Sequence, residues 1–118
     1  MPEVIELEFH SKESSDFQLS RLVRASLRKY TVPITAFISD ALIADDTCLG
    51  VSFDHSGQDD AYHRADGSSL RTGKIQSARK EGRFWLLETQ DGNYVIASFK
   101  RELGRASFLK LLQSGERF

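Results

Sequence analysis

Five side chains that can bind a metal lie within one short polar stretch of the sequence: Asp54, His55, Asp59, Asp60 and His63. Carboxylates and imidazoles are ligands of zinc and other transition metals. Their spacing matches no familiar helical or knuckle site, and no cysteine lies among them. Polar loops accumulate Asp and His for solubility alone, so we expect neither a metal nor a cofactor here.

The single cysteine is the next candidate for chemistry. Cys48 lies in an apolar, strand-like run, where a lone cysteine is usually a small core residue and not a nucleophile. The chain has no Gly-rich phosphate loop, no zincin helix and no serine-nucleophile elbow. We therefore expect no catalytic residues, and predict that the protein is not an enzyme.

Basic residues are concentrated in the second part of the chain. Residues 1–66 hold 12 acidic and 6 basic residues, whereas residues 67–118 hold 5 acidic and 10 basic ones. This asymmetry has two explanations, which are opposed charged faces or mutual neutralisation within the fold. The isoelectric point of about 6.3 is far below that of a protein that coats nucleic acid without specificity.

A hairpin is expected to gather several of these basic residues. Asp91-Gly92 between two apolar runs is typical of a two-residue type I′ turn. If Gln90 faces Asn93, Arg83 lies opposite Lys100. Such a pair of like charges indicates either a solvated hairpin end with its own counter-charges or an anion site. The candidate anion-binding residues are Arg71, Lys74, Arg79, Arg83, Lys100 and Arg101, and Trp85 or Tyr94 would stack on a base if exposed.

Two helices are predicted beside these strands. Ser15 and Gln18 have the spacing of a capping box, and the segment 15–30 carries apolar residues at helical intervals, namely Leu19, Leu22, Val23, Leu27 and Tyr30. We expect these to face the core and Arg21, Arg24 and Arg28 to form a solvated basic ridge, a secondary candidate for binding. A short helix over 104–113 is expected to close the fold.

The strands are predicted from alternation and β-branched residues. Residues 5–9 alternate in the manner of a half-buried strand, and 34–38 and 48–53 are further strands. Residues 42–46 are ambiguous, and 55–69 are predicted to be a long surface loop. The sequence therefore predicts a single α+β domain over 1–118, with a strongly bent antiparallel sheet or an SH3-like barrel.

Two families resemble this region. Gly82-Arg83-Phe84-Trp85-Leu86 resembles the Gly-Arg-Trp-Tyr-Leu segment of WYL domains, and the stretch from Tyr94 to Leu103 resembles their Tyr-Arg-x-Phe-Arg ending. The region is also similar to the Sm-like barrel of the Hfq type, through Gly73, Ile75, Ser77, Phe84, Leu86 and Leu87. Both resemblances imply a small SH3-like barrel with a leading helix. The arginine that WYL domains carry after the tyrosine is replaced by Val95.

Two functions remain open at this point. The first is a non-enzymatic regulatory or binding module that contacts nucleic acid or a nucleotide-like anion through the basic, aromatic hairpin. The second is a protein-interaction factor, such as an inhibitor, immunity or accessory protein, that uses the acidic first part and the long loop. With no signal peptide and no apolar run of about 20 residues, we expect a cytoplasmic protein without membrane contact.

Overall fold

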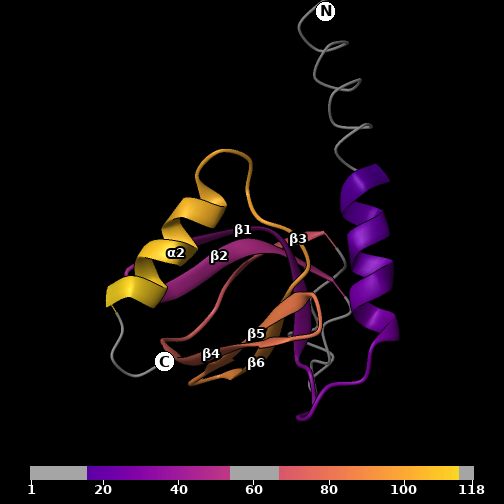
Figure 1. Cartoon of the computed structure of the whole chain (residues 1–118), viewed down its shortest axis with the longest axis horizontal. Coiled ribbons are helices and arrows are strands. Elements are labelled where there is room, and N and C mark those ends of the chain that lie inside the picture. The colour runs from indigo at the N-terminus through magenta and orange to yellow at the C-terminus, as the bar shows by residue number, and fades with distance from the viewer. Residues whose placement is uncertain (1–15, 54–66, 115–118) are drawn as a thin grey trace, which may run out of the picture.

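The computed structural model describes residues 16–53 and 67–114 of the chain. Residues 16–27 are helical and are called the first helix below. The remaining elements are β1 (Ala36–Ala44), β2 (Thr47–Phe53), β3 (Ser68–Arg71), β4 (Ile75–Glu81), β5 (Phe84–Thr89), β6 (Gly92–Ile96) and α2 (Gly104–Ser114). The predicted α+β class and both predicted helices are thus confirmed (Figure 1).

The strands form one six-stranded sheet in the order β3-β2-β1-β6-β5-β4. The pairing of β1 with β6 is parallel and every other pairing is antiparallel, so the sheet is mixed. Only residues 72–74 connect β3 and β4, the two edge strands, which limits the gap between their ends to about 15 Å. The sheet is therefore strongly bent, yet it stays open and does not close into a barrel.

Each face of the bent sheet has its own core and its own helix. One core draws side chains from all six strands and is covered by Phe108 and Leu111 of α2. The other is covered by Leu22 and Ala25 of the first helix. Adjacent residues of β5 divide between them, since Leu87 belongs to the α2 side and Leu86 to the side of the first helix.

The β5–β6 hairpin has a different register from the predicted one. Thr89 pairs with Gly92 and Trp85 with Ile96, so the loop is Gln90-Asp91 and β6 ends before Lys100. The predicted opposition of Arg83 and Lys100 is therefore wrong. Gly92 is needed within the strand, because a Cβ there would lie 2.4 Å from Oγ1 of Thr35.

The ambiguous segment 42–46 completes β1 and the following turn. Asp45 and Asp46 have φ of 53° and 63°, which are the two positive values that a type I′ turn requires. Nearer the middle of β1 the register shifts between Ser39 and Leu42, around Asp40 with its φ of 56°. A β-bulge thus interrupts the strand that lies at the centre of the molecule.

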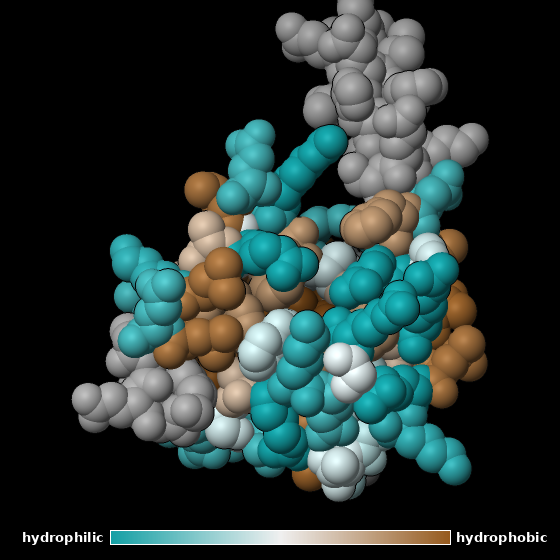
Figure 2. Space-filling model, viewed as in Figure 1, coloured by the Kyte–Doolittle hydropathy of each residue, from teal (hydrophilic) through white to brown (hydrophobic). Residues whose placement is uncertain are grey.

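The first helix is rotated relative to the predicted orientation, although Leu22 faces the core as expected. Its sheet-facing residues are Leu22 and Ala25, whereas Leu19, Val23 and Leu27 are exposed. Figure 2 shows apolar side chains along the outer edge of this helix. The expected burial of Leu19, Val23 and Leu27 is therefore wrong, because the helix packs on the sheet through Leu22 and Ala25, with Arg21 beside them over Phe84.

Some predictions fall on residues outside the described part of the chain. These are the strand over 5–9, most of the 55–69 loop and the Asp54 to His63 cluster. The last two residues of the predicted loop, Ser68 and Ser69, belong to β3. Within residues 16–53 and 67–114, no group of metal-binding side chains is close enough to hold an ion, and no helix is long and apolar enough to cross a membrane.

Candidate functional site

The structure divides the predicted anion-binding residues among three places. Arg71 and Lys74 lie at the β3–β4 connection, whereas Arg83 lies in the turn at the opposite end of β4. The seven residues of β4 separate those ends by about 23 Å. Lys100 and Arg101 lie in the segment that precedes α2. These residues therefore do not form one compact site.

The two aromatic candidates lie within or against the core. Tyr94 is only 2% exposed, so the condition for stacking on a base is not met by this ring. Trp85 is partly buried and packs edge-on against Phe108 of α2, with the ring centroids 4.8 Å apart. The structure thus assigns the aromatic side chains of the hairpin chiefly to packing.

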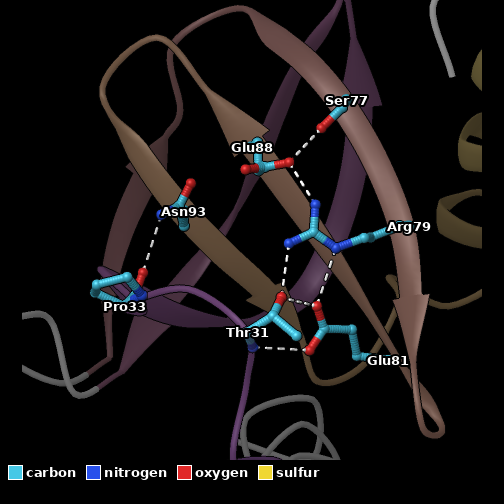
Figure 3. A network of polar contacts seen from close by, with 7 residues as sticks. All are labelled: Thr31, Pro33, Ser77, Arg79, Glu81, Glu88 and Asn93. Atoms are coloured by element: carbon cyan, nitrogen blue, oxygen red, sulfur yellow. Dashed lines mark hydrogen bonds and ion pairs between the residues drawn. The ribbon is translucent and has the colours of Figure 1, made fainter.

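Arg79 is held in a polar network on β4 and β5 (Figure 3). Its guanidinium pairs with Glu81 at 3.0 Å and with Glu88 at 2.6 Å. Its Nη2 also donates to the hydroxyl of Thr31, which lies in the segment after the first helix. Because both carboxylates already occupy Arg79, its charge is compensated, and it ties that segment to the sheet.

The carboxylates of this network are stabilised as anions. The pKa of Glu81 is lowered chiefly by the hydrogen bond from the Thr31 hydroxyl, with Arg79 contributing. The pKa of Glu88 is lowered chiefly by the hydroxyl of Ser77, which donates at 2.7 Å, and again by Arg79. A carboxylate whose pKa is lowered is a poor general acid or base near neutral pH, so the network is structural in character.

A second group of arginines forms no ion pair with any described carboxylate. It consists of Arg21 and Arg24 from the first helix, Arg83 from the β4–β5 turn and Arg105 from α2, and we call it the arginine cluster. Among the described residues, ion pairs within 4.0 Å involve only Arg79. The pKa of Arg21 is lowered first by burial and then by the positive charges of Arg105, Arg24 and Arg83.

Two members of the cluster are positioned by aromatic rings. The guanidinium of Arg21 lies over the ring of Phe84 at 4.5 Å, and its Nε donates to the carbonyl of Ala97 at 2.9 Å. The guanidinium of Arg105 lies over Phe99 at 4.8 Å. Stacking leaves the edges of a guanidinium free to donate, so both groups are oriented for oxygen acceptors.

The surroundings of the cluster add further positive potential. Arg105 is the second residue of α2, whose first turn contains no acidic residue. The positive end of that helix dipole is therefore not neutralised from within the turn. Arg28 extends the basic surface along the first helix, with its guanidinium against Gly82 beside Arg83. The geometry suits a ligand with several negatively charged oxygens, such as a chain of phosphates.

A groove of about 390 Å³ lies beside the bulge in β1. Leu42, Leu49 and Val51 supply apolar walls, with Asp40 and Lys100 among the polar lining residues. The Asp40 carboxylate already accepts a hydrogen bond from the side-chain amide of Gln18. Lys100 is the only predicted site residue that lines this groove.

Sequence reasoning found part of the arginine cluster. Arg83 was a predicted site residue, and Arg21 and Arg24 belonged to the secondary basic ridge. Arg105 was missed, since nothing in its local sequence distinguishes it from a solvated residue at a helix start. In comparisons with protein-family models, curated proteins and solved structures, no match to this chain was found. The resemblances to WYL and Sm-like domains therefore stay predictions.

Proposed function

We propose that this protein is a non-enzymatic regulatory module that binds nucleic acid through the phosphates, using the arginine cluster. The observation that supports the proposal is that Arg24, Arg83 and Arg105 lie near enough to Arg21 to lower its pKa, while none of the four forms an ion pair within 4.0 Å among the described residues. A fold does not normally accumulate mutually repelling charges unless something offsets the cost. Phosphates would offset it and would find donors already oriented by Phe84 and Phe99.

The proposal differs in its residues from the hairpin site predicted from sequence. Arg83 is retained, whereas Arg79 is neutralised and Tyr94 is buried. Since Tyr94 is buried and Trp85 packs on Phe108, binding would depend mainly on phosphate contacts from one local basic patch. The proposal places the protein in the cytoplasm, where nucleic acid is accessible.

The test is the salt dependence of binding to a fluorescent single-stranded oligonucleotide, followed by anisotropy. If four phosphates are neutralised, affinity should fall roughly 50-fold between about 50 and 200 mM salt. The double variant Arg24→Ala/Arg83→Ala should bind more weakly and should lose about half of the logarithmic salt slope.

The matched control is Arg71→Ala/Lys74→Ala, which removes the same net charge at the far end of β4. It should leave the slope nearly unchanged. Equal losses in both double variants would mean that net charge alone drives binding, and absent or salt-independent binding would overturn the proposal. The alternative, an interaction factor that uses the acidic first part and the 55–69 loop, concerns mostly residues outside the described part and stays a prediction.

A further inference from the structure

The outward face of the first helix carries a continuous apolar ridge. Leu19, Val23 and Leu27 follow one another at intervals of four residues, so they lie in one row along the helix. Their exposed fractions are 59%, 48% and 79%. Scattered apolar residues are normal on a protein surface, but an aligned row on one element is typical of an interaction surface.

Such a ridge has a defined way of packing against another helix. Rows of residues at intervals of four interdigitate when two helices cross at about −50°, with their axes about 8–10 Å apart. Val23 is the centre of the row, with one leucine on either side. A two-fold axis through Val23 would therefore place Leu19 of each helix near Leu27 of the other, using the same residues on both sides.

The charges at the two ends of the helix favour this antiparallel arrangement. Asp16 is exposed at the start of the described helix, and Arg28 and Lys29 are exposed just after its end. In an antiparallel pair, the acidic end of one helix lies towards the basic end of the other. A parallel pair would instead bring like ends together.

We propose that the Leu19, Val23 and Leu27 ridge is covered by the same ridge of a second copy of this chain, in an antiparallel pair with two-fold symmetry. The patch is self-complementary in shape and in charge, as a two-fold interface must be. The interface is small, which favours a dimer that dissociates on dilution. This inference does not rest on nucleic-acid binding, because none of the three ridge residues belongs to the arginine cluster.

Disulfide trapping tests the symmetry directly. The native Cys48 is fully buried, and burial raises the pKa of its thiol to about 12, so it should not react under mild oxidation. Under those conditions Val23→Cys should give a disulfide-linked dimer. Leu109→Cys on α2 is the control, since Leu109 is also 48% exposed but lies off the ridge, and it should remain largely monomeric.

A mixing experiment establishes the direction of the pair. Leu19→Cys and Leu27→Cys should each cross-link poorly alone and should form a mixed dimer when combined. Efficient linkage of Leu19→Cys to itself would indicate a parallel pair and would overturn the proposed arrangement.

Sedimentation velocity over a concentration series provides the reversible test. The wild type should approach twice the monomer mass at high concentration. Val23→Asp should stay monomeric, and Leu109→Asp should behave as the wild type. A wild-type protein that stays monomeric throughout would overturn the proposal, whether the ridge is then covered by another part of the chain, by a different protein or by nothing.

Discussion

At the scale of single residues, the arginines of this chain lie in two opposite electrostatic environments. Arg79 lies between two carboxylates, and hydrogen bonds to Glu81 are the first cause of its raised pKa. Arg21 lies among three other arginines and over an aromatic ring. The same type of side chain is therefore neutralised by carboxylates in one place and surrounded by like charges in the other.

The network around Arg79 leads to a prediction about acid stability. The folded-state pKa values of Glu81 and Glu88 are lowered, whereas an unfolded glutamate titrates near about 4.3. Their contribution is thus present above about pH 4.3 and is lost as the pH falls through the folded pKa values. Thr31→Val removes the main donor to Glu81 and should make the decline in acid shallower, as measured by urea unfolding from about pH 3 to 7.

Thr47→Val is the matched control for this measurement. The Thr47 hydroxyl also accepts from an arginine, Arg71, but it donates to the carbonyl of Ala44 and touches no described carboxylate. Its loss should change the acid decline little. The same change in both variants would show that the lowered pKa of Glu81 does not produce the effect.

Gly50 is the residue at which the fold tolerates a side chain least. A Cβ there would lie 2.4 Å from Cγ2 of Ile38 and 2.8 Å from the backbone oxygen of Ser39, beside the β1 bulge. We expect Gly50→Ala to lower the free energy of unfolding by about 2–3 kcal/mol, because the backbone cannot move aside. Gly67→Ala is the control, since Gly67 has a φ of 89° but open space around it, and it should cost about 1 kcal/mol or less.

At the scale of elements, the orientation of the first helix decides what the protein presents to solvent. Leu22 and Ala25 pack on Phe84 and its neighbours, and Arg21 passes beside them over the ring of Phe84. Long arginine side chains can cover apolar surface with their methylene groups while keeping the guanidinium in water. An arginine-bearing face is therefore compatible with the sheet, and the apolar ridge is left outside.

This orientation is tested by two leucines of the same helix. Leu22→Ala should lower the free energy of unfolding by about 2 kcal/mol, since Leu22 is buried against the sheet. Leu27→Ala carries the same change in helix propensity but should cost less than about 0.5 kcal/mol in dilute, monomeric protein. Chemical denaturation of both variants makes the comparison, and a larger loss for Leu27→Ala would contradict the described orientation.

At the scale of the whole molecule, the two ends of β4 have different electrostatic character. The end with Arg71 and Lys74 also holds acidic turn residues, since the Asp46 carbonyl accepts from Ile75 and the Asp91 carboxylate accepts from the backbone of Gly73. The end with Arg83 adjoins the first helix and α2, which both contribute arginines. Within the described part of the chain, the charges are thus mixed at one end of β4 and mainly basic at the other.

Relief of this repulsion should be measurable in the free protein. We expect Arg24→Gln to raise the melting temperature by about 1–2 °C at low salt, and the gain to vanish near 1 M salt, where the screening length is about 3 Å. Lys74→Gln should give no gain under the same conditions. A loss of stability in Arg24→Gln at low salt would mean that the cluster is compensated after all.

Much of the fold follows from local pattern. The β-branched run that ends at Phe53 forms β2, the apolar spacing after Gly104 forms α2, and alternation in β5 divides Leu86 from Leu87 as strand geometry requires. The strong bend was also expected. Local pattern did not determine whether the sheet closes or which strands are neighbours. The pairing of β1 with β6, for example, joins residues about 60 positions apart in the sequence.

The candidate site could be predicted only in part for the same reason. Helical periodicity grouped Leu19, Leu22, Val23, Leu27 and Tyr30 as the core-facing residues. Of the four within the helix, only Leu22 is buried, because periodicity alone does not say which side faces the sheet. The Asp91-Gly92 motif predicted a register in which each residue of β5 pairs two positions further along β6 than it does in the structure. The turn falls instead at Gln90-Asp91, because Gly92 is required within the strand where Thr35 approaches it.

By itself, the sequence determined the two helices, the approximate positions of β1, β2, β5 and β6, and the alternation of residues between the two faces of β5, whereas β3 and β4 were not predicted. These properties depend on neighbours within one turn of helix or one pleat of strand. The tertiary structure decided that Arg79 is neutralised, that Tyr94 is buried and that Arg105 joins Arg21, Arg24 and Arg83. Those outcomes depend on charges and rings brought together from distant parts of the chain, where the electrostatic and packing energies are set by separation in space and not along the sequence.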